Sequence, residues 1–189
     1  MNDDKTKKIP DEANVVFKGV LHDVYQWQQE TFDGSFQTYE VIKRRNTVTM
    51  LAVTTDKKII VNYEEQPHRG KFIAIPGGIC EDRETDLENA KRELEEESGF
   101  RTDSWELIMK YDVLKNRKID WWDCFYIARG CEKTGTVKFD PGEKIETALL
   151  SFEEFMKIIW DESFRNKQLR DFIKERGGEV EFKKFLFEE

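Results

Sequence analysis

The sequence has few cysteines and no long apolar run. Its 189 residues include only three cysteines, an odd number without the close paired spacing of a zinc site. So small a set also excludes a disulfide-rich secreted scaffold, and free thiols in a reducing cytoplasm are the simpler interpretation. No window approaches the roughly 18 apolar residues of a membrane-spanning helix, and the charged first residues lack an apolar signal core. We therefore expect a cytoplasmic protein without a membrane partner.

The sequence also lacks an excess of positive charge. It carries 31 Lys and Arg residues against 39 Asp and Glu residues, which gives a formal net charge of −8. Nucleic-acid-binding proteins normally gather Lys and Arg into a basic surface, so this balance argues against a nucleic-acid partner. A small anionic ligand remains compatible, because divalent cations can neutralise both the site and the ligand.

The element patterns predict a mixed α/β (α+β) protein of ordinary domain size. Stretches rich in β-branched and aromatic residues flank Asp33-Gly34, a strong hairpin signal, and predict an N-terminal β-region over residues 14–45. Further strands lie before and after a central helix, expected over residues 85–98 and stopped by Gly99. This order indicates a mixed sheet with helices on its faces.

The segment from Gly78 to Phe100, GICEDRETDLENAKRELEEESGF, concentrates the residues that suggest chemistry. Its glycine-rich turn leads into a helix N-terminus, where backbone N–H groups can receive phosphate oxygens. On the expected helix, Glu93, Glu96 and Glu97 share one arc, with Cβ atoms on the order of 5–6 Å apart. Such carboxylates repel one another, and a hard divalent cation such as Mg²⁺ turns that repulsion into a binding site.

A metal ion held there would polarise a phosphoryl oxygen, lower the pKa of a bound water and neutralise charge on a departing phosphate. Arg92 stands at i,i+4 spacing from Glu96 and is expected to orient that carboxylate without touching a substrate. The alternative is that the acidic run ELEEE forms only a solvated helix face.

The complete pattern resembles the Nudix box: glycine, five residues, glutamate, seven residues, Arg-Glu, an aliphatic residue, any residue, Glu-Glu, any residue, glycine and a hydrophobic residue. The residues at its fixed positions are Gly78, Glu84, Arg92, Glu93, Leu94, Glu96, Glu97, Gly99 and Phe100. The resemblance implies the αβα sandwich of that family, and Mg²⁺ (or Mn²⁺) held by Glu93, Glu96 and Glu97. It makes Glu84 and the carbonyl of Gly78 weaker candidates for the metal shell.

Beyond the box, the chain is similar to the ADP-ribose and ADP-sugar pyrophosphatase branch of that family. In this branch an N-terminal β-region helps to build a homodimer and supplies part of the nucleoside pocket, which residues 14–45 would provide here. Residues 46–178 would then form the Nudix domain. Residues 1–13 are expected to be a flexible tail, and residues 179–189 either a last strand or a tail packed on a partner.

The same branch places an acidic residue on a late loop, where it acts as a general base or an additional metal ligand. The segment FDPGEKIETALL offers Glu143 as the first candidate, then Glu146 and Asp140. Pro141-Gly142 is typical of a mobile loop that could close over a substrate. An ordinary exposed turn is the alternative.

Substrate contacts are expected from Gly77 and Gly78 in the phosphate cradle and from Arg69 before it, with simple solvation as the alternative for the arginine. Trp121 and Trp122 are adjacent on an expected strand, so their side chains should point to opposite faces. We expect one of them, Trp122, to stack on a nucleobase or cover a dimer interface.

Together these patterns predict hydrolysis of the pyrophosphate link in a nucleoside diphosphate joined to another group. The resemblance to the ADP-ribose and ADP-sugar branch makes ADP-ribose or an ADP-sugar the first candidate substrate, giving AMP and a sugar phosphate. Two other functions fit the same scaffold: a house-cleaning hydrolase of nucleoside triphosphates or dinucleoside polyphosphates, and a nucleotide-binding regulator without turnover. The sequence keeps every glutamate of the box, which favours an enzyme.

Overall fold

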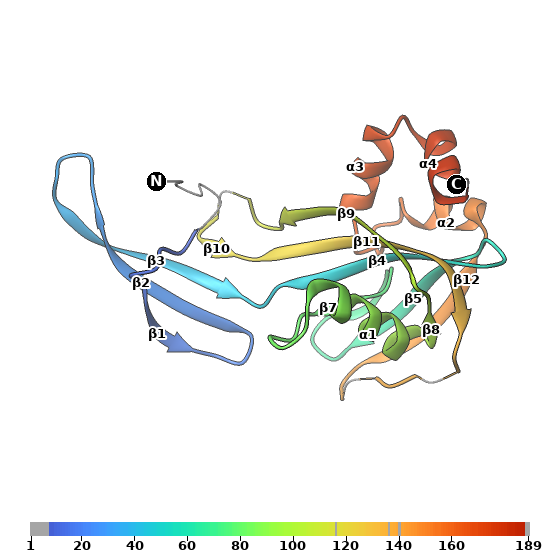
Figure 1. The fold of residues 1–189 in the computed structure, drawn as a ribbon, viewed down its shortest axis with the longest axis horizontal. Coiled ribbons are helices and arrows are strands. Elements are labelled where there is room, and N and C mark those ends of the chain that lie inside the picture. Colours follow the sequence, from blue (N-terminus) through green and yellow to red (C-terminus); the bar gives the residue numbers. More distant parts are fainter. Residues whose placement is uncertain (1–7, 116, 136, 140, 188–189) are drawn as a thin grey trace.

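A computed structural model describes residues 8–115, 117–135, 137–139 and 141–187, and Figure 1 shows their arrangement. The elements in chain order are β1 (Asn14–Lys18), β2 (His22–Glu30), β3 (Phe36–Arg44), β4 (Thr47–Thr54), β5 (Ile59–Gln66), β6 (Gly70–Ala74), β7 (Gly77–Ile79), α1 (Asp86–Ser98), β8 (Phe100–Arg101), β9 (Ser104–Asp112), β10 (Ile119–Asp120), β11 (Trp122–Lys133), β12 (Lys144–Leu150), α2 (Phe152–Ile158), α3 (Gln168–Glu175) and α4 (Glu179–Phe187).

The strands form an N-terminal sheet and a larger sheet. The N-terminal sheet has the order β1-β2-β3-β10, and it extends away from the helices in Figure 1. The larger sheet has the order β12-β5-β4-β11-β8, with β6, β7 and β9 pairing with β5, β4 and β11. Its strands β4 and β11 run parallel, whereas β4 and β5 run antiparallel. The predicted mixed sheet is therefore confirmed.

Helices cover both faces of the larger sheet, which is the expected αβα sandwich (Figure 1). Side chains alternate along β4, so Met50 packs on the α1 side with Leu94, while Leu51 and Val53 pack on the side of α2, α3 and α4. Within the described ranges, none of the helices is both long and apolar enough to cross a membrane.

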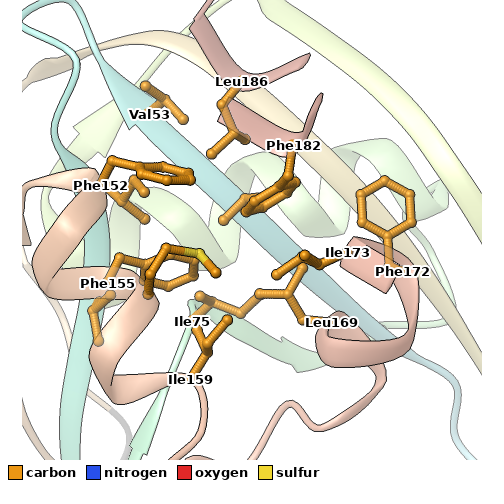
Figure 2. Close-up of a cluster of buried hydrophobic side chains, with 14 of the residues drawn as sticks. Val53, Ile75, Phe152, Phe155, Ile159, Leu169, Phe172, Ile173, Phe182 and Leu186 are labelled. Atoms are coloured by element: carbon orange, nitrogen blue, oxygen red, sulfur yellow. The ribbon is translucent and has the colours of Figure 1, made fainter. Parts of the chain in front are cut away.

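The end of the chain forms a helix and not the strand or tail expected for residues 179–189. Figure 2 shows Phe182 and Leu186 of α4 pointing into the aromatic cluster beneath α2 and α3. Both side chains are buried while Lys184 between them is exposed. A strand would place all three side chains on one face. Only a helix can bury Phe182 and Leu186 and leave Lys184 exposed. Residues 188–189 lie outside the described residues.

The start of the described chain is packed against the N-terminal sheet. Lys8 forms an ion pair with Asp112, and Ile9 is buried against Trp27 and Val41. The prediction of a flexible tail over residues 1–13 is therefore wrong for the last part of this range, because Ile9 packs against the apolar side chains of Trp27 and Val41. Residues 1–7 lie outside the described residues.

Candidate functional site

The box segment folds as a short strand, a loop and α1. Thr85 caps α1 with a reciprocal pair of hydrogen bonds to Glu88, and Gly99 ends the helix in the left-handed conformation, with φ of 71°. The limits of this helix match the predicted ones at its end, and at its start differ by one residue because Thr85 is the cap. They fix the rotation of α1, so its acidic arc faces the turn at Gly77 and Gly78.

Glu97 is the most deeply placed of the three box glutamates. Glu97 is only 7% exposed. Its Oε2 accepts hydrogen bonds from Asn62 Nδ2 at 3.0 Å and from the Gly77 N–H at 3.1 Å. Burial raises the pKa of Glu97 well above its usual value, and the nearby charges of Glu64 and Glu93 raise it further. A proton or a cation must therefore neutralise the negative charge of this carboxylate.

The two glycines of the turn have separate roles. A Cβ atom on Gly78 would lie 2.1 Å from Cδ of Glu93, so glycine allows this carboxylate to lie against the backbone of the turn. A Cβ atom on Gly77 would instead lie 2.6 Å from the carbonyl oxygen of Val48, so glycine allows β7 to approach β4. Gly78 is therefore needed for the position of Glu93, and Gly77 is needed for the packing of the sheet.

Arg92 holds three carboxylates at once. Its Nε donates to Glu84 at 3.0 Å, and its Nη1 donates to Glu93 at 2.8 Å and to Glu96 at 3.0 Å. The contact with Glu96 is the one expected from the i,i+4 spacing. The guanidinium therefore orients most of the acidic arc from one position.

Two acids from outside the box lie near Glu97. Glu64 on β5 is buried, and this burial raises its pKa to about 7, with a further contribution from Glu143. Gln66 donates to Glu143 at 3.2 Å. Asn62, Glu64 and Gln66 are every second residue along β5, so their side chains lie on the same face of the sheet. Asn62 bonds to Glu97, so this is the face that α1 covers.

Glu146 points to the other face. The hydroxyl of the next residue, Thr147, donates to Asn62 at 3.0 Å on the glutamate side, and adjacent strand residues point in opposite directions. The fold therefore separates Glu146 from the glutamates. Asp140 lies outside the described residues, so Glu143 is the described candidate base that the fold brings to the site.

The oxygen donors gathered here suit a hard divalent cation in kind. Among the described residues, no group of three or more acidic, histidine or cysteine side chains is arranged to hold a metal ion as it stands. Glu93 and Glu96 are engaged with Arg92, while Glu97 binds Asn62. The donor set fits Mg²⁺, and loading would require these side chains to reorient.

Arg69 lies near Glu64, and its predicted contact with a substrate stays a prediction. Its guanidinium carbon is 5.4 Å from the centre of the Phe72 ring, and its charge acts to lower the pKa of Glu64. Phe72 pairs with Glu64 across β5 and β6, so Arg69 lies over the glutamate side of this pair.

The two adjacent tryptophans have different neighbours, although Trp121 lies between β10 and β11 and not on the single strand expected for both. The ring N–H of Trp121 donates to Thr47, and the guanidinium carbon of Arg44 lies 3.9 Å from the Trp121 ring centre. The ring N–H of Trp122, the predicted substrate contact, instead donates to Asp120 at 3.0 Å. A role for Trp122 in stacking on a nucleobase stays a prediction.

Asn62 and Glu64 are functional candidates that the box pattern does not reveal. Their signal in the sequence is a pair of polar residues, two apart, in the otherwise apolar segment IIVNYE that begins β5. Such a pair predicts a polar patch on one strand face, although only the pairing of β5 with its neighbours places it beside α1.

Comparisons with known proteins agree with this architecture. A NUDIX domain family model matches residues 43–172. The chain is 36% identical over 86 residues to an ADP-ribose pyrophosphatase of Bacillus subtilis (strain 168), which is 45% of this chain and 46% of that protein. It is 25% identical over 146 residues to a methanol dehydrogenase activator of Bacillus methanolicus, which is 76% of this chain and 78% of that protein.

A solved structure supports the fold. The crystal structure of an ADP compounds hydrolase matches with a TM-score of 0.67 and 19% sequence identity, covering 87% of this chain and 93% of that chain. The matched segment spans about half the length of the ADP-ribose pyrophosphatase, at 46% of that protein. Because the family model matches more than half of the chain, the protein belongs to the NUDIX domain family.

Proposed function

We propose that this chain is a divalent-metal-dependent pyrophosphohydrolase that cleaves the diphosphate link of a nucleoside diphosphate joined to another group. The observation that carries the proposal is the gathering of four carboxylates, those of Glu64, Glu93, Glu97 and Glu143, beside the Pro-Gly-Gly turn. The relatives named as an ADP-ribose pyrophosphatase and an ADP compounds hydrolase make ADP-ribose or an ADP-sugar the first substrates to test.

Mg²⁺, with Mn²⁺ as a substitute, would be held by Glu93, Glu96 and Glu97 with the carbonyl of Gly78, and would supply Lewis-acid activation of phosphoryl and water oxygens. Arg92 donates hydrogen bonds to Glu93 and Glu96 of this set, and to Glu84, and so keeps these carboxylates oriented.

The reaction itself is a hydrolysis without a covalent enzyme intermediate. Water attacks one phosphorus atom of the P–O–P link, and Glu143 accepts the proton that the water loses. The bond from that phosphorus to the bridging oxygen breaks, and the oxygen leaves with the other phosphoryl group. With ADP-ribose, the products are AMP and a ribose phosphate.

A second candidate function is regulation by nucleotide binding without turnover. The relative named as a methanol dehydrogenase activator matches a larger share of this chain, 76%, than the named pyrophosphatase does, at 45%. This chain nevertheless keeps all the box glutamates, which a binding module does not need.

A substrate panel tests these functions together. The protein is incubated with ADP-ribose, ADP-glucose, ATP or diadenosine tetraphosphate in Mg²⁺, and released mononucleotides are quantified by chromatography. We expect the fastest release from ADP-ribose or ADP-glucose, and its loss when EDTA removes the metal. A preference for ATP or the dinucleotide would indicate the house-cleaning function. Binding of ADP-ribose with no hydrolysis of any compound would indicate the regulator.

We also propose that the chain forms a homodimer through its N-terminal sheet. All five residues of β1 are exposed, and they include Val15, Val16 and Phe17, whose exposed fractions are 48%, 52% and 60%. An apolar strand exposed on both faces is a surface that a second copy would cover. Light scattering of the purified protein should therefore give a dimer, and a particle of 22.5 kDa would contradict it.

A further inference from the structure

Arg165 lies on the coil between α2 and α3, where the chain runs along the edge of β6. Phe164 forms a parallel bridge with Ile73, and the Arg165 N–H donates to the Ile73 carbonyl at 2.8 Å. On the other side, Asn166 Oδ1 accepts the N–H of Ile75 at 3.0 Å. Bonds before and after Arg165 therefore hold it in a fixed register at the edge of the sheet.

This register turns the Arg165 side chain to the glutamate side. Phe164 is buried with Ile73 in the core beneath α2, α3 and α4, so its neighbour points to the opposite face. Consistently, the guanidinium carbon of Arg165 lies 5.5 Å from the centre of the Phe72 ring. Phe72 pairs directly with Glu64, so Arg165 shares a face with that acid.

Arg165 is also available to a ligand. Its side chain is exposed, and within the described part of the chain its guanidinium forms neither a hydrogen bond nor an ion pair. The surrounding protein nevertheless desolvates it and lowers its pKa, an effect that Arg69 increases and that Glu64 and Glu97 oppose. Arg92, in contrast, is saturated by three carboxylates. Arg165 is thus an accessible cation close to the acids.

We propose that Arg165 binds one phosphoryl group of the substrate's diphosphate. Arg69 lies against the same Phe72 ring, so the two guanidinium groups lie close enough to repel each other. A bound anion would relieve that repulsion. The planar fork of N–H donors on a guanidinium matches phosphate oxygens, which a lysine ammonium does not reproduce. The substrate class rests on the proposed function, but the binding step does not need turnover.

Calorimetric titration of ADP and of adenosine in EDTA tests this assignment without hydrolysis. We expect Arg165→Gln to raise the Kd for ADP by about tenfold or more, because a charge-assisted hydrogen bond is lost, and to leave the Kd for adenosine unchanged. Arg165→Lys should fall between Arg165→Gln and the wild type. The matched control is Lys167→Gln, which removes an exposed positive charge two residues away and should bind ADP as the wild type does.

Equal ADP affinity in the wild type and Arg165→Gln, or no ADP binding by the wild type, would overturn the assignment. Equal losses for ADP and adenosine would also overturn it, because they would indicate a general change in the pocket. The substrate panel is a separate readout. A protein that binds ADP through Arg165 and hydrolyses no panel compound would contradict the proposed function while supporting the assignment.

Discussion

Glu97→Gln is expected to lower kcat/KM on the best substrate of the panel by about three orders of magnitude, because a hydrolase of this kind depends on its metal for several kcal/mol of transition-state stabilisation. The fold should persist. A glutamine oxygen can still accept the hydrogen bonds that Asn62 and Gly77 donate to Glu97. Moreover, the substitution removes a buried charge whose pKa is already raised by burial and by Glu64. In metal-free buffer the free energy of unfolding should therefore be unchanged or larger.

Steady-state kinetics and chemical denaturation, measured on the same preparations, check both parts of this prediction. Glu95→Gln is the matched control, because it removes one carboxylate from α1 about 200° around the helix from Glu97. It should retain nearly full activity. A Glu97→Gln enzyme within a few-fold of the wild type would show that Glu97 does not serve the reaction.

Gly78→Ala is expected to reduce kcat/KM by about tenfold to a hundredfold, the range typical of losing the support of a metal ligand. The new methyl group would occupy the place of the Glu93 carboxylate, with 2.1 Å between the added Cβ and Cδ of Glu93. Because the obstacle is the end of a flexible side chain, Glu93 can turn away and the protein should stay folded. The concentration of Mg²⁺ required for half-maximal activity should rise.

The neighbouring glycine provides the contrast. Gly77→Ala would place a Cβ 2.6 Å from the backbone carbonyl of Val48, which cannot turn away, so we expect a loss of about 1–3 kcal/mol in the free energy of unfolding. Thermal melts and Mg²⁺ titrations of both variants separate the effects. If Gly78→Ala had a normal Mg²⁺ requirement, the close approach of Glu93 to the turn would have no role in metal binding.

The part of the site that could be predicted from sequence is the part that local structure determines. A capping threonine, apolar residues at helical spacing and a terminal glycine fix α1, so Glu93, Glu96 and Glu97 follow on one arc. The Arg92–Glu96 contact follows from the same spacing. The contact of Arg92 with Glu84 does not, because it depends on how the loop before α1 folds back.

The remaining site residues depend on pairing between distant segments. Glu64 becomes a neighbour of Glu97 because β5 lies beside α1, and Arg165 joins them because its coil pairs with β6, far away in sequence. The amino-acid pattern around Arg165 carries no sign of this contact. Similarly, alternation predicts that Trp121 and Trp122 diverge, but not which of them meets Arg44.

The C-terminal segment shows a different limit. Phe182 and Leu186 are four residues apart, a spacing that puts them on one face of either a helix or a strand. The exposed Lys184 decides between these structures only once the aromatic cluster is known to receive both apolar side chains (Figure 2).

The central claim is that the box glutamates bind a divalent cation, and electron paramagnetic resonance of Mn²⁺ tests it most directly. Mn²⁺ is titrated into the wild type and into Glu97→Gln, with and without a non-hydrolysable ADP-ribose analogue. We predict that the wild type removes the signal of free Mn²⁺, more strongly with the analogue, and that Glu97→Gln loses most of this binding. A free Mn²⁺ signal that is the same for both proteins, even with the analogue present, would contradict the account.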